Sequence, residues 1–194
     1  HFTNWLAYIF QTKRKAMTAW VLQGVPGTGK GIFYTKVLRP LFGNEHVPMR
    51  ALQNIEEQFN LYMRQALFLV VDEFHMASAN AGTMKIADKL KNAITENTMT
   101  IRAMRSNQVE MPNYTNFIFL TNRMDAVKIE EGDRRYNIAP RQEQKLEHVY
   151  PEVIDGIDDI STELHKFAAL LRNYNVNKQL VRTPIANNAK AQMA

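Results

Sequence analysis

The stretch Gly24-Val25-Pro26-Gly27-Thr28-Gly29-Lys30-Gly31 decides how the rest of the chain is interpreted, because it combines closely spaced glycines with a lysine. Glycines let a backbone turn tightly and aim several N–H groups at one point, which is what a bound phosphate requires. The lysine adds a positive charge for the outer phosphates of a nucleotide, and a helix that follows offers its positive end. The stretch therefore predicts a phosphate-binding loop.

The residues on either side supply the context that such a loop needs. Ala19-Trp20-Val21-Leu22 predicts a short buried strand that leads into the loop, and residues 30–39 predict a helix that stops at Pro40. A plain glycine-rich turn is the alternative, and this strand–loop–helix order argues against it.

Gly31 departs from the usual pattern of these loops. Ser or Thr normally stands there and gives its hydroxyl to Mg²⁺. Three explanations stay open from the sequence: water takes that place, the hydroxyl of Thr28 or Thr35 does, or metal is held weakly.

A second signal is the apolar run at residues 67–71, which ends in Asp72-Glu73. A run that is apolar throughout predicts a central parallel strand, buried on both faces. A carboxylate at the end of such a strand lies beside the phosphate loop in an open α/β sheet. Asp72 is expected to hold Mg²⁺, and Glu73 to polarise the attacking water as a general base. The alternative is a strand that ends in a solvated turn.

A third signal is the apolar stretch 117–120, which ends in Thr121-Asn122. An amide at the end of a neighbouring strand can orient the attacking water, so Asn122 is a candidate catalytic residue. Asn is also common in ordinary turns. The position after the other two motifs favours the functional interpretation.

A fourth signal is Asp133-Arg134-Arg135-Tyr136. An arginine donated across a subunit boundary can stabilise charge on a phosphoryl group during its transfer. Adjacent strand residues point to opposite sides, so one arginine is expected to be this finger and the other to pair with Asp133 or Glu131. The sequence does not choose between Arg134 and Arg135, and a solvated charged turn is the alternative.

A hairpin is predicted over residues 98–111, with Ser106-Asn107 at its turn. It carries Arg102 and Arg105, and no acidic residue precedes Glu110 within it. In a ring-shaped motor such a hairpin can grip the phosphates of single-stranded DNA without reading its sequence. An exposed hairpin with ordinary charges is the alternative.

The chain as a whole predicts an α/β fold: a P-loop domain with a central parallel sheet flanked by helices, and small helical extensions at both ends. We expect an N-terminal helical extension at 1–18, an ATPase core at 19–150, and a C-terminal helical extension and tail at 151–194. The expected helices are 2–17, closed by Lys13-Arg14-Lys15, and 51–64, 83–94 and 160–173, with a polar tail at 183–194.

Composition limits the classes of function. The chain has 194 residues and no cysteine, which excludes disulfides, thiolate metal sites and cysteine nucleophiles. No apolar run nears the roughly 18 residues of a membrane span, so no membrane partner is expected. The net charge of +5 permits a polyanionic partner. The first residue is His1 rather than Met, as expected for a piece of a longer protein.

With the four motifs in this order, the chain resembles the superfamily 3 helicases, which are AAA+-type hexameric motors of viruses and phages. It is more similar still to the helicase domain of phage and prophage primase–helicase replication proteins, including the primase-polymerase type. The similarity also includes Val-Val-Asp-Glu-Phe at 70–74, Leu-Thr-Asn-Arg at 120–123 and the stretch 164–184.

The resemblance implies hydrolysis of ATP with Mg²⁺, a homo-hexameric ring, translocation on single-stranded DNA, and a primase or polymerase domain in the same parent chain. It implies the cytoplasm of a bacterial host as the location. Lys30 would bind phosphate, Asp72-Glu73 would be the Walker B pair, Asn122 the polar sensor, and Arg134 or Arg135 the finger. Arg105 stands where the family often has lysine. The alternatives are an assembly or loading module that binds ATP and oligomerises without unwinding, and an inactive interaction domain.

Overall fold

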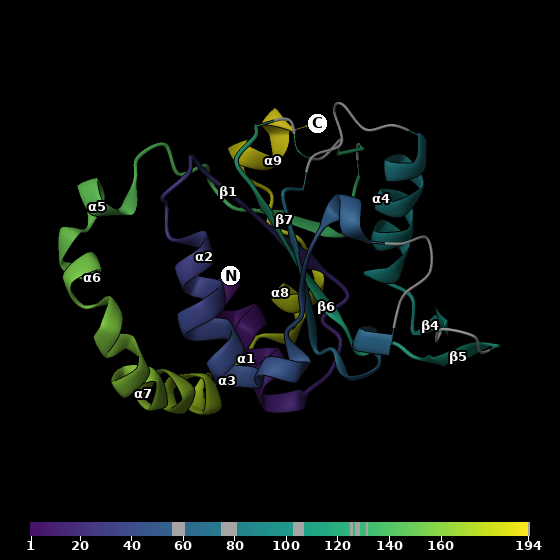
Figure 1. The fold of residues 1–194 in the computed structure, drawn as a ribbon, viewed down its shortest axis with the longest axis horizontal. Helices are drawn as coiled ribbons and strands as arrows, with labels where there is room; N and C mark the ends of the chain where they lie inside the picture. The colour runs from purple at the N-terminus through teal and green to yellow at the C-terminus, as the bar shows by residue number, and fades with distance from the viewer. Residues whose placement is uncertain are drawn as a thin grey trace.

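The structure is a computed structural model that describes residues 1–55, 61–74, 81–102, 107–124, 126, 129–130 and 132–193. A five-stranded sheet with the order β2-β3-β6-β1-β7 runs through its centre, and every neighbouring pair is parallel (Figure 1). The strands are β1 (Ala19–Gln23), β2 (Met49–Ala51), β3 (Phe68–Asp72), β6 (Asn116–Thr121) and β7 (Tyr136–Ile138). Because all five are parallel, their carboxyl ends share one edge of the sheet.

Helices cover both faces of this sheet. They are α1 (Phe2–Thr12), α2 (Lys30–Ile32), a π-helix (Phe33–Leu38), α3 (Arg39–Phe42), α4 (Ala81–Ala93), α5 (Leu146–Val149), α6 (Pro151–Asp155), α7 (Ile160–Asn173), α8 (Lys178–Arg182) and α9 (Asn188–Gln192), with 3₁₀ turns at Asn44–His46, Leu52–Asn54, Leu61–Gln65 and Ile157–Asp159. Leu69 and Val71 of β3 pack in one core with α4, while Phe68 and Val70 pack in a second core with α1. A strand buried on both faces explains the continuous apolar run of the sequence.

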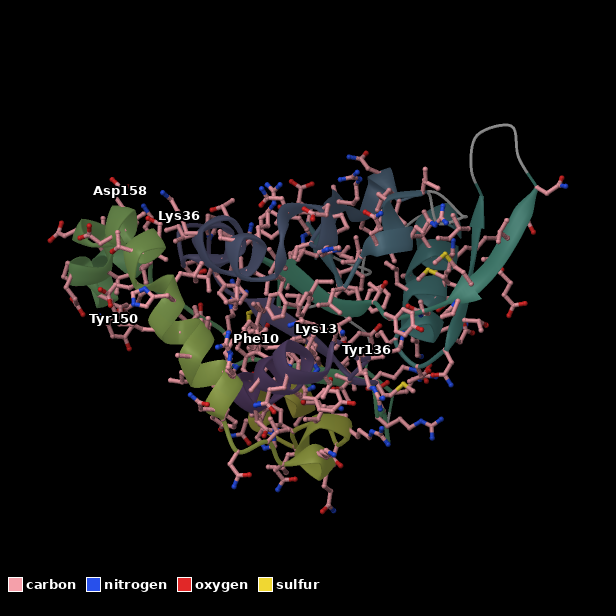
Figure 2. The ribbon with its side chains drawn as sticks, turned by 90° about the horizontal axis from the view of Figure 1, so that it is seen from below. Phe10, Lys13, Lys36, Tyr136, Tyr150 and Asp158 are labelled. Carbon is pink, nitrogen blue, oxygen red and sulfur yellow. The ribbon has the colours of Figure 1, made fainter. Side chains whose placement is uncertain are left out.

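The predicted strands at 19–22, 67–71 and 117–120 and the predicted helices at 83–94 and 160–173 are confirmed, within one or two residues for most ends. The predicted hairpin is also confirmed: β4 (Thr98–Arg102) pairs antiparallel with β5 (Gln108–Pro112). Figure 2 shows the two teal strands projecting from the body of the molecule. No helix among the described residues is long and apolar enough to cross a membrane.

The first helix is shorter than predicted. It ends at Thr12, because Lys13 adopts a left-handed conformation with φ of 54°. The expectation that Lys13-Arg14-Lys15 closes the last helical turn is therefore wrong. Lys15 is instead buried, and its Nζ donates to the carbonyls of Ala93 and Thr115.

Two other helix predictions are also wrong. The helix after the loop does not stop at Pro40 but continues through α3 to Phe42. A proline crowds the carbonyl four residues before it, and the wider π-helical turn ahead of Pro40 makes room for the ring. The helix expected over 51–64 is absent from the described part of that range: Ala51 pairs with Asp72 as the end of β2, and short 3₁₀ turns follow.

The C-terminal segment is more than a polar tail. It contains α9, whose N-terminus is capped by the Asn187 side chain accepting from the Lys190 N–H at 2.9 Å. Ala189 and Met193 are buried in the core that contains α4. Ala189 and Met193, four residues apart, therefore anchor this helix to the core. The polar composition of the segment gives little sign of the helix in the sequence.

Candidate functional site

The glycine-rich loop joins the end of β1 to the start of α2. Gly27 and Gly29 have φ values of 86° and 90°, a region that side chains with a Cβ rarely adopt. At Gly24 a Cβ would lie 2.8 Å from the Cβ of Gln142, which leaves no room for one. The backbone of this loop therefore requires glycine at all three positions.

Lys30 is the charged group of the loop. Its Nζ donates to the carbonyl oxygens of Gly24 at 2.9 Å and Val25 at 3.2 Å, and to Oγ1 of Thr28 at 3.1 Å. Partial burial lowers the pKa of Lys30, the positive charge of Arg141 lowers it further, and the negative charge of Asp72 raises it. The ammonium thus lies against the loop, within electrostatic reach of the end of β3.

The turn after β3 holds Glu73 in an unusual conformation. Glu73 has a φ of 53°, in the left-handed region that costs a non-glycine residue roughly 1 kcal/mol. Its N–H donates to Oδ1 of Asp72 at 2.9 Å, and the N–H of buried Phe74 donates to the Leu120 carbonyl at 3.0 Å. These anchors on both sides hold an exposed glutamate at the carboxyl edge of the sheet. Strain of this kind is concentrated at functional sites.

Asn122 lies next to the start of the loop. Thr121 pairs with Gln23 of β1, and its carbonyl accepts from the Gly24 N–H at 3.2 Å. Because β6 separates β1 from β3, the residue that follows β6 lies between the loop and the acidic pair. The structure therefore brings the loop, Lys30, Asp72, Glu73 and Asn122 to one edge, as the sequence predicts.

Thr28 and Thr35 carry the two hydroxyls that could replace the one missing at Gly31, and both hydroxyls already make hydrogen bonds. Oγ1 of Thr35 donates to the Gly31 carbonyl at 2.9 Å, as a helical threonine commonly does. Oγ1 of Thr28 accepts from Lys30 inside the loop. In the part of the chain that the structure describes, no group of three or more His, Asp or Glu side chains is placed to hold a metal ion.

Arg134 and Arg135 lie at the other end of the sheet, beside the amino end of β7, while the phosphate loop lies beside the carboxyl ends of the strands. Asp133, whose side chain is 2% exposed, accepts from the backbone N–H groups of Arg135 and Tyr136. One of its carboxylate oxygens lies 3.8 Å from Nη1 of Arg135, and the other lies 3.6 Å from Nζ of Lys190. Arg135 is therefore the ion-pair partner, and Arg134 is the exposed arginine.

The candidate DNA contacts are only partly described. The backbone of Arg102 pairs with Gln108 at the outer end of the hairpin. The Arg102 side chain and the whole of Arg105 lie outside the residues that the structure describes. Their role in binding DNA stays a prediction.

The sequence interpretation missed a segment that crosses the loop. Gln142 donates its N–H to the Gln23 carbonyl at 3.1 Å and accepts from the Val25 N–H at 2.9 Å, which extends the sheet toward the loop. The N–H of Leu146 donates to the Gly27 carbonyl at 2.9 Å. No motif marks this segment, and Arg141, shortly after β7, is its only signal in the sequence.

Comparison with known proteins places these features in a family. A family model described as a family of unknown function (DUF5906) matches residues 22–135, from the end of β1 to the arginine pair. A DNA primase-polymerase of Nitratiruptor phage NrS-1 is 30% identical over 196 residues, which cover 97% of this chain and 26% of the relative. The chain thus spans about a quarter of the curated relative that it matches.

Solved structures agree. An apo structure of the NrS-1 C-terminal region has a TM-score of 0.87 and 29% identity, and covers 99% of this chain and 45% of the solved one. A second apo structure of the same region, called the A form, has a TM-score of 0.82 and 28% identity over the same shares. The expected similarity to phage primase-polymerase proteins and the mixed α/β fold with a central parallel sheet are confirmed. The chain belongs to the DUF5906 family.

Proposed function

We propose that this chain is the ATP-hydrolysing motor of a phage-type DNA replication protein, which translocates on single-stranded DNA as a homo-oligomeric ring. One observation carries the proposal: the glycine loop with Lys30, the Asp72-Glu73 pair and Asn122 meet at one edge of a parallel sheet whose strand order places β6 between β1 and β3. This is the arrangement that a P-loop NTPase needs.

The loop fits the phosphates of a nucleotide. Its three glycines keep side chains away from the backbone, and Lys30 supplies a cation whose present partners are carbonyl and hydroxyl oxygens. A phosphate is a stronger partner than a carbonyl for an ammonium group, because both carry charge. Lys30 would bind it with only a rotation of its own side chain.

Asp72 would hold Mg²⁺, which would neutralise negative charge on the phosphates. Mg²⁺ keeps several waters and needs few protein ligands when phosphates supply the others, so one carboxylate is compatible with a metal. Of the two nearby hydroxyls, Thr28 Oγ1 is better placed to serve as a second ligand for Mg²⁺, because it lies in the loop. The hydroxyl of Thr35 is hydrogen-bonded to the helix backbone instead.

Glu73 would take a proton from the attacking water, and Asn122 would orient that water. The exposed carboxylate of Glu73 stands at the sheet edge on a turn that is anchored on both sides. A general base must be held in place before it can work, and it contributes typically 10²- to 10⁴-fold to the rate.

The relation to a phage DNA primase-polymerase supports a role in phage DNA replication, with DNA as the partner and the bacterial host cytoplasm as the place of action. A primase or polymerase domain would belong to the same parent chain, since the matched residues make up 26% of that relative. The hairpin β4–β5 would carry the DNA contacts through Arg102 and Arg105.

The test is steady-state ATPase with and without single-stranded DNA, combined with strand displacement and a mass measurement for the oligomer. Glu73→Gln is expected to keep ATP binding and to lose on the order of 100-fold or more in turnover. Glu163→Gln, an exposed glutamate of α7, is the matched control and is expected to keep full activity. Equal turnover in wild type and Glu73→Gln removes Glu73 as the base.

A second function has one observation in its favour. Gly31 gives the loop no hydroxyl for Mg²⁺, which suits an assembly or loading module that binds ATP and oligomerises without unwinding. ATP-dependent ring formation without strand displacement would support this module over the motor.

A further inference from the structure

Arg141 is placed beside the phosphate loop by the backbone on both sides of it. Ala139 donates its N–H to the Val21 carbonyl at 3.0 Å, and Gln142 bonds both Gln23 and Val25. Arg141 therefore follows the edge of β1 to the point where the loop begins. Its side chain is 16% exposed, far less than that of a solvated surface arginine.

The guanidinium of Arg141 is incompletely paired. Its Nε lies 3.1 Å from the carboxylate of Glu143, which is itself 64% exposed. Its Nε and Nη1 are both buried, and neither makes a hydrogen bond with the residues that the structure describes, so the contact with Glu143 is an ion pair only. A buried charged donor without a partner is costly, and such an atom in a native structure calls for an explanation. A ligand that supplies the missing acceptor is one.

The charges around Arg141 favour an anion. Partial burial lowers the pKa of Lys30, and the positive charge of Arg141 lowers it further, as expected for two cations that lie close enough to repel each other. Asp72 is the carboxylate whose charge opposes this effect on Lys30. Lys30 and Arg141 are two partly buried cations next to one loop, so their charges repel each other. A group with several negative charges, such as a nucleotide phosphate, would offset that repulsion if it bound between them.

We propose that Arg141 binds the phosphates of the nucleotide from within the same subunit, as a second cation beside Lys30. The inference rests on the proposed nucleotide site. It assigns a binding role to a residue outside the four motifs and outside the residues matched by the family model. The planar guanidinium would pair its Nη1 with a phosphate oxygen while Nε stays beside Glu143.

The experiment measures the affinity of the protein for ATP, ADP and adenosine by calorimetry in wild type, Arg141→Gln and Arg141→Lys. Arg141→Gln is expected to weaken ATP on the order of 10- to 100-fold, as expected for a charged hydrogen bond, and to leave adenosine within twofold. Arg141→Lys keeps the charge but not the fork, and its ATP affinity is expected between the two. The Lys variant also keeps the test valid if the Gln variant folds poorly.

Two controls separate a phosphate contact from a structural role. Glu143→Gln removes the ion pair of Arg141 but leaves the guanidinium, so ATP affinity is expected to stay within twofold of wild type. Arg172→Gln removes an exposed arginine of α7 and is expected to leave the affinity for ATP unchanged.

An equal loss of affinity for ATP and adenosine in Arg141→Gln, or no loss for either, overturns the role of Arg141. Failure of wild type to bind ATP overturns the nucleotide site itself, whereas binding that depends on Lys30 but not on Arg141 overturns this inference alone.

Discussion

At the scale of single residues, Lys15 shows how far tertiary contacts override a sequence pattern. In the sequence it belongs to a basic triplet, yet its Nζ is buried between α4 and the start of β6, where it donates to the carbonyls of Ala93 and Thr115. Burial lowers the pKa of Lys15 from 10.5 to about 7, and the negative charge of Glu96 partly opposes this. The lysine is therefore a titrating group of the core rather than part of a basic surface.

The shift predicts how stability depends on pH. Between pH 7 and 10.5 the unfolded chain keeps the Lys15 proton, while the folded chain has lost it. The unfolded state then binds more protons, so the free energy of unfolding rises with pH across this window, by an amount on the order of a few kcal/mol. Lys15→Met is expected to remove most of this rise, measured by urea unfolding at pH 7, 8.5 and 10. Lys85→Met, an exposed lysine of α4, is the control and should keep it. An unchanged slope in Lys15→Met would contradict the burial of the charge.

At the scale of secondary-structure elements, the sequence predicts well those strands whose signal lies within their own residues. Each of the three central strands contains a continuous run of four apolar residues, and polar residues stand only at the strand ends. These runs are the signal from which the sequence predicts the strands. Strand β2 has three residues and lies at the edge, so its pairing with β3 rather than its composition makes it a strand. Helix α9 is likewise fixed by Ala189 and Met193, which pack against a core that the local sequence does not reveal.

The same distinction divides the site. The loop, the acidic pair and Asn122 each follow a recognisable strand, so their meeting at one edge could be predicted from the order of motifs. The choice between Arg134 and Arg135 could not, because it depends on Asp133 being buried with Lys190, which comes from α9 more than fifty residues later. Arg141 was missed for the same reason: its position depends on the backbone bonds of Gln142 with β1 and the loop.

The hairpin β4–β5 is the element on which DNA binding is predicted to depend. Removing both cations with Arg102→Gln and Arg105→Gln is expected to weaken single-stranded DNA binding equally for all sequences. Each lost phosphate contact on single strands should reduce the slope of log affinity against log salt by about 0.7, so the double variant should lose about 1.4. Arg172→Gln on α7 is the matched charge control. A double variant with wild-type affinity and slope would exclude the hairpin as the contact.

At the scale of the whole molecule, the two edges of the sheet carry complementary parts of one proposed site. The phosphate loop follows the carboxyl end of β1, while Arg134 precedes β7, whose first residue pairs with Ala19 at the other end of β1. The five residues of β1 separate the two edges by roughly 15 Å. An arginine side chain does not span that distance from the far edge, so Arg134 cannot complete the site of its own subunit. A neighbouring copy in a ring would present its Arg134 edge to this loop.

This geometry predicts complementation between two inactive variants. Lys30→Ala should abolish hydrolysis at its own loop but still donate Arg134, and Arg134→Gln should keep an intact loop but donate nothing. Mixed in equal amounts and allowed to exchange subunits, the two should recover about a quarter of wild-type ATPase, since one interface in four joins a good loop to a good arginine. A mixture of Lys30→Ala with the double variant Lys30→Ala/Arg134→Gln contains no competent interface and is the control. Without recovery in a mixed ring, whose formation native mass spectrometry can establish, Arg134 is not donated to the neighbouring site. Arg141 of the same subunit, whose charge acts on Lys30, is then the arginine to test next.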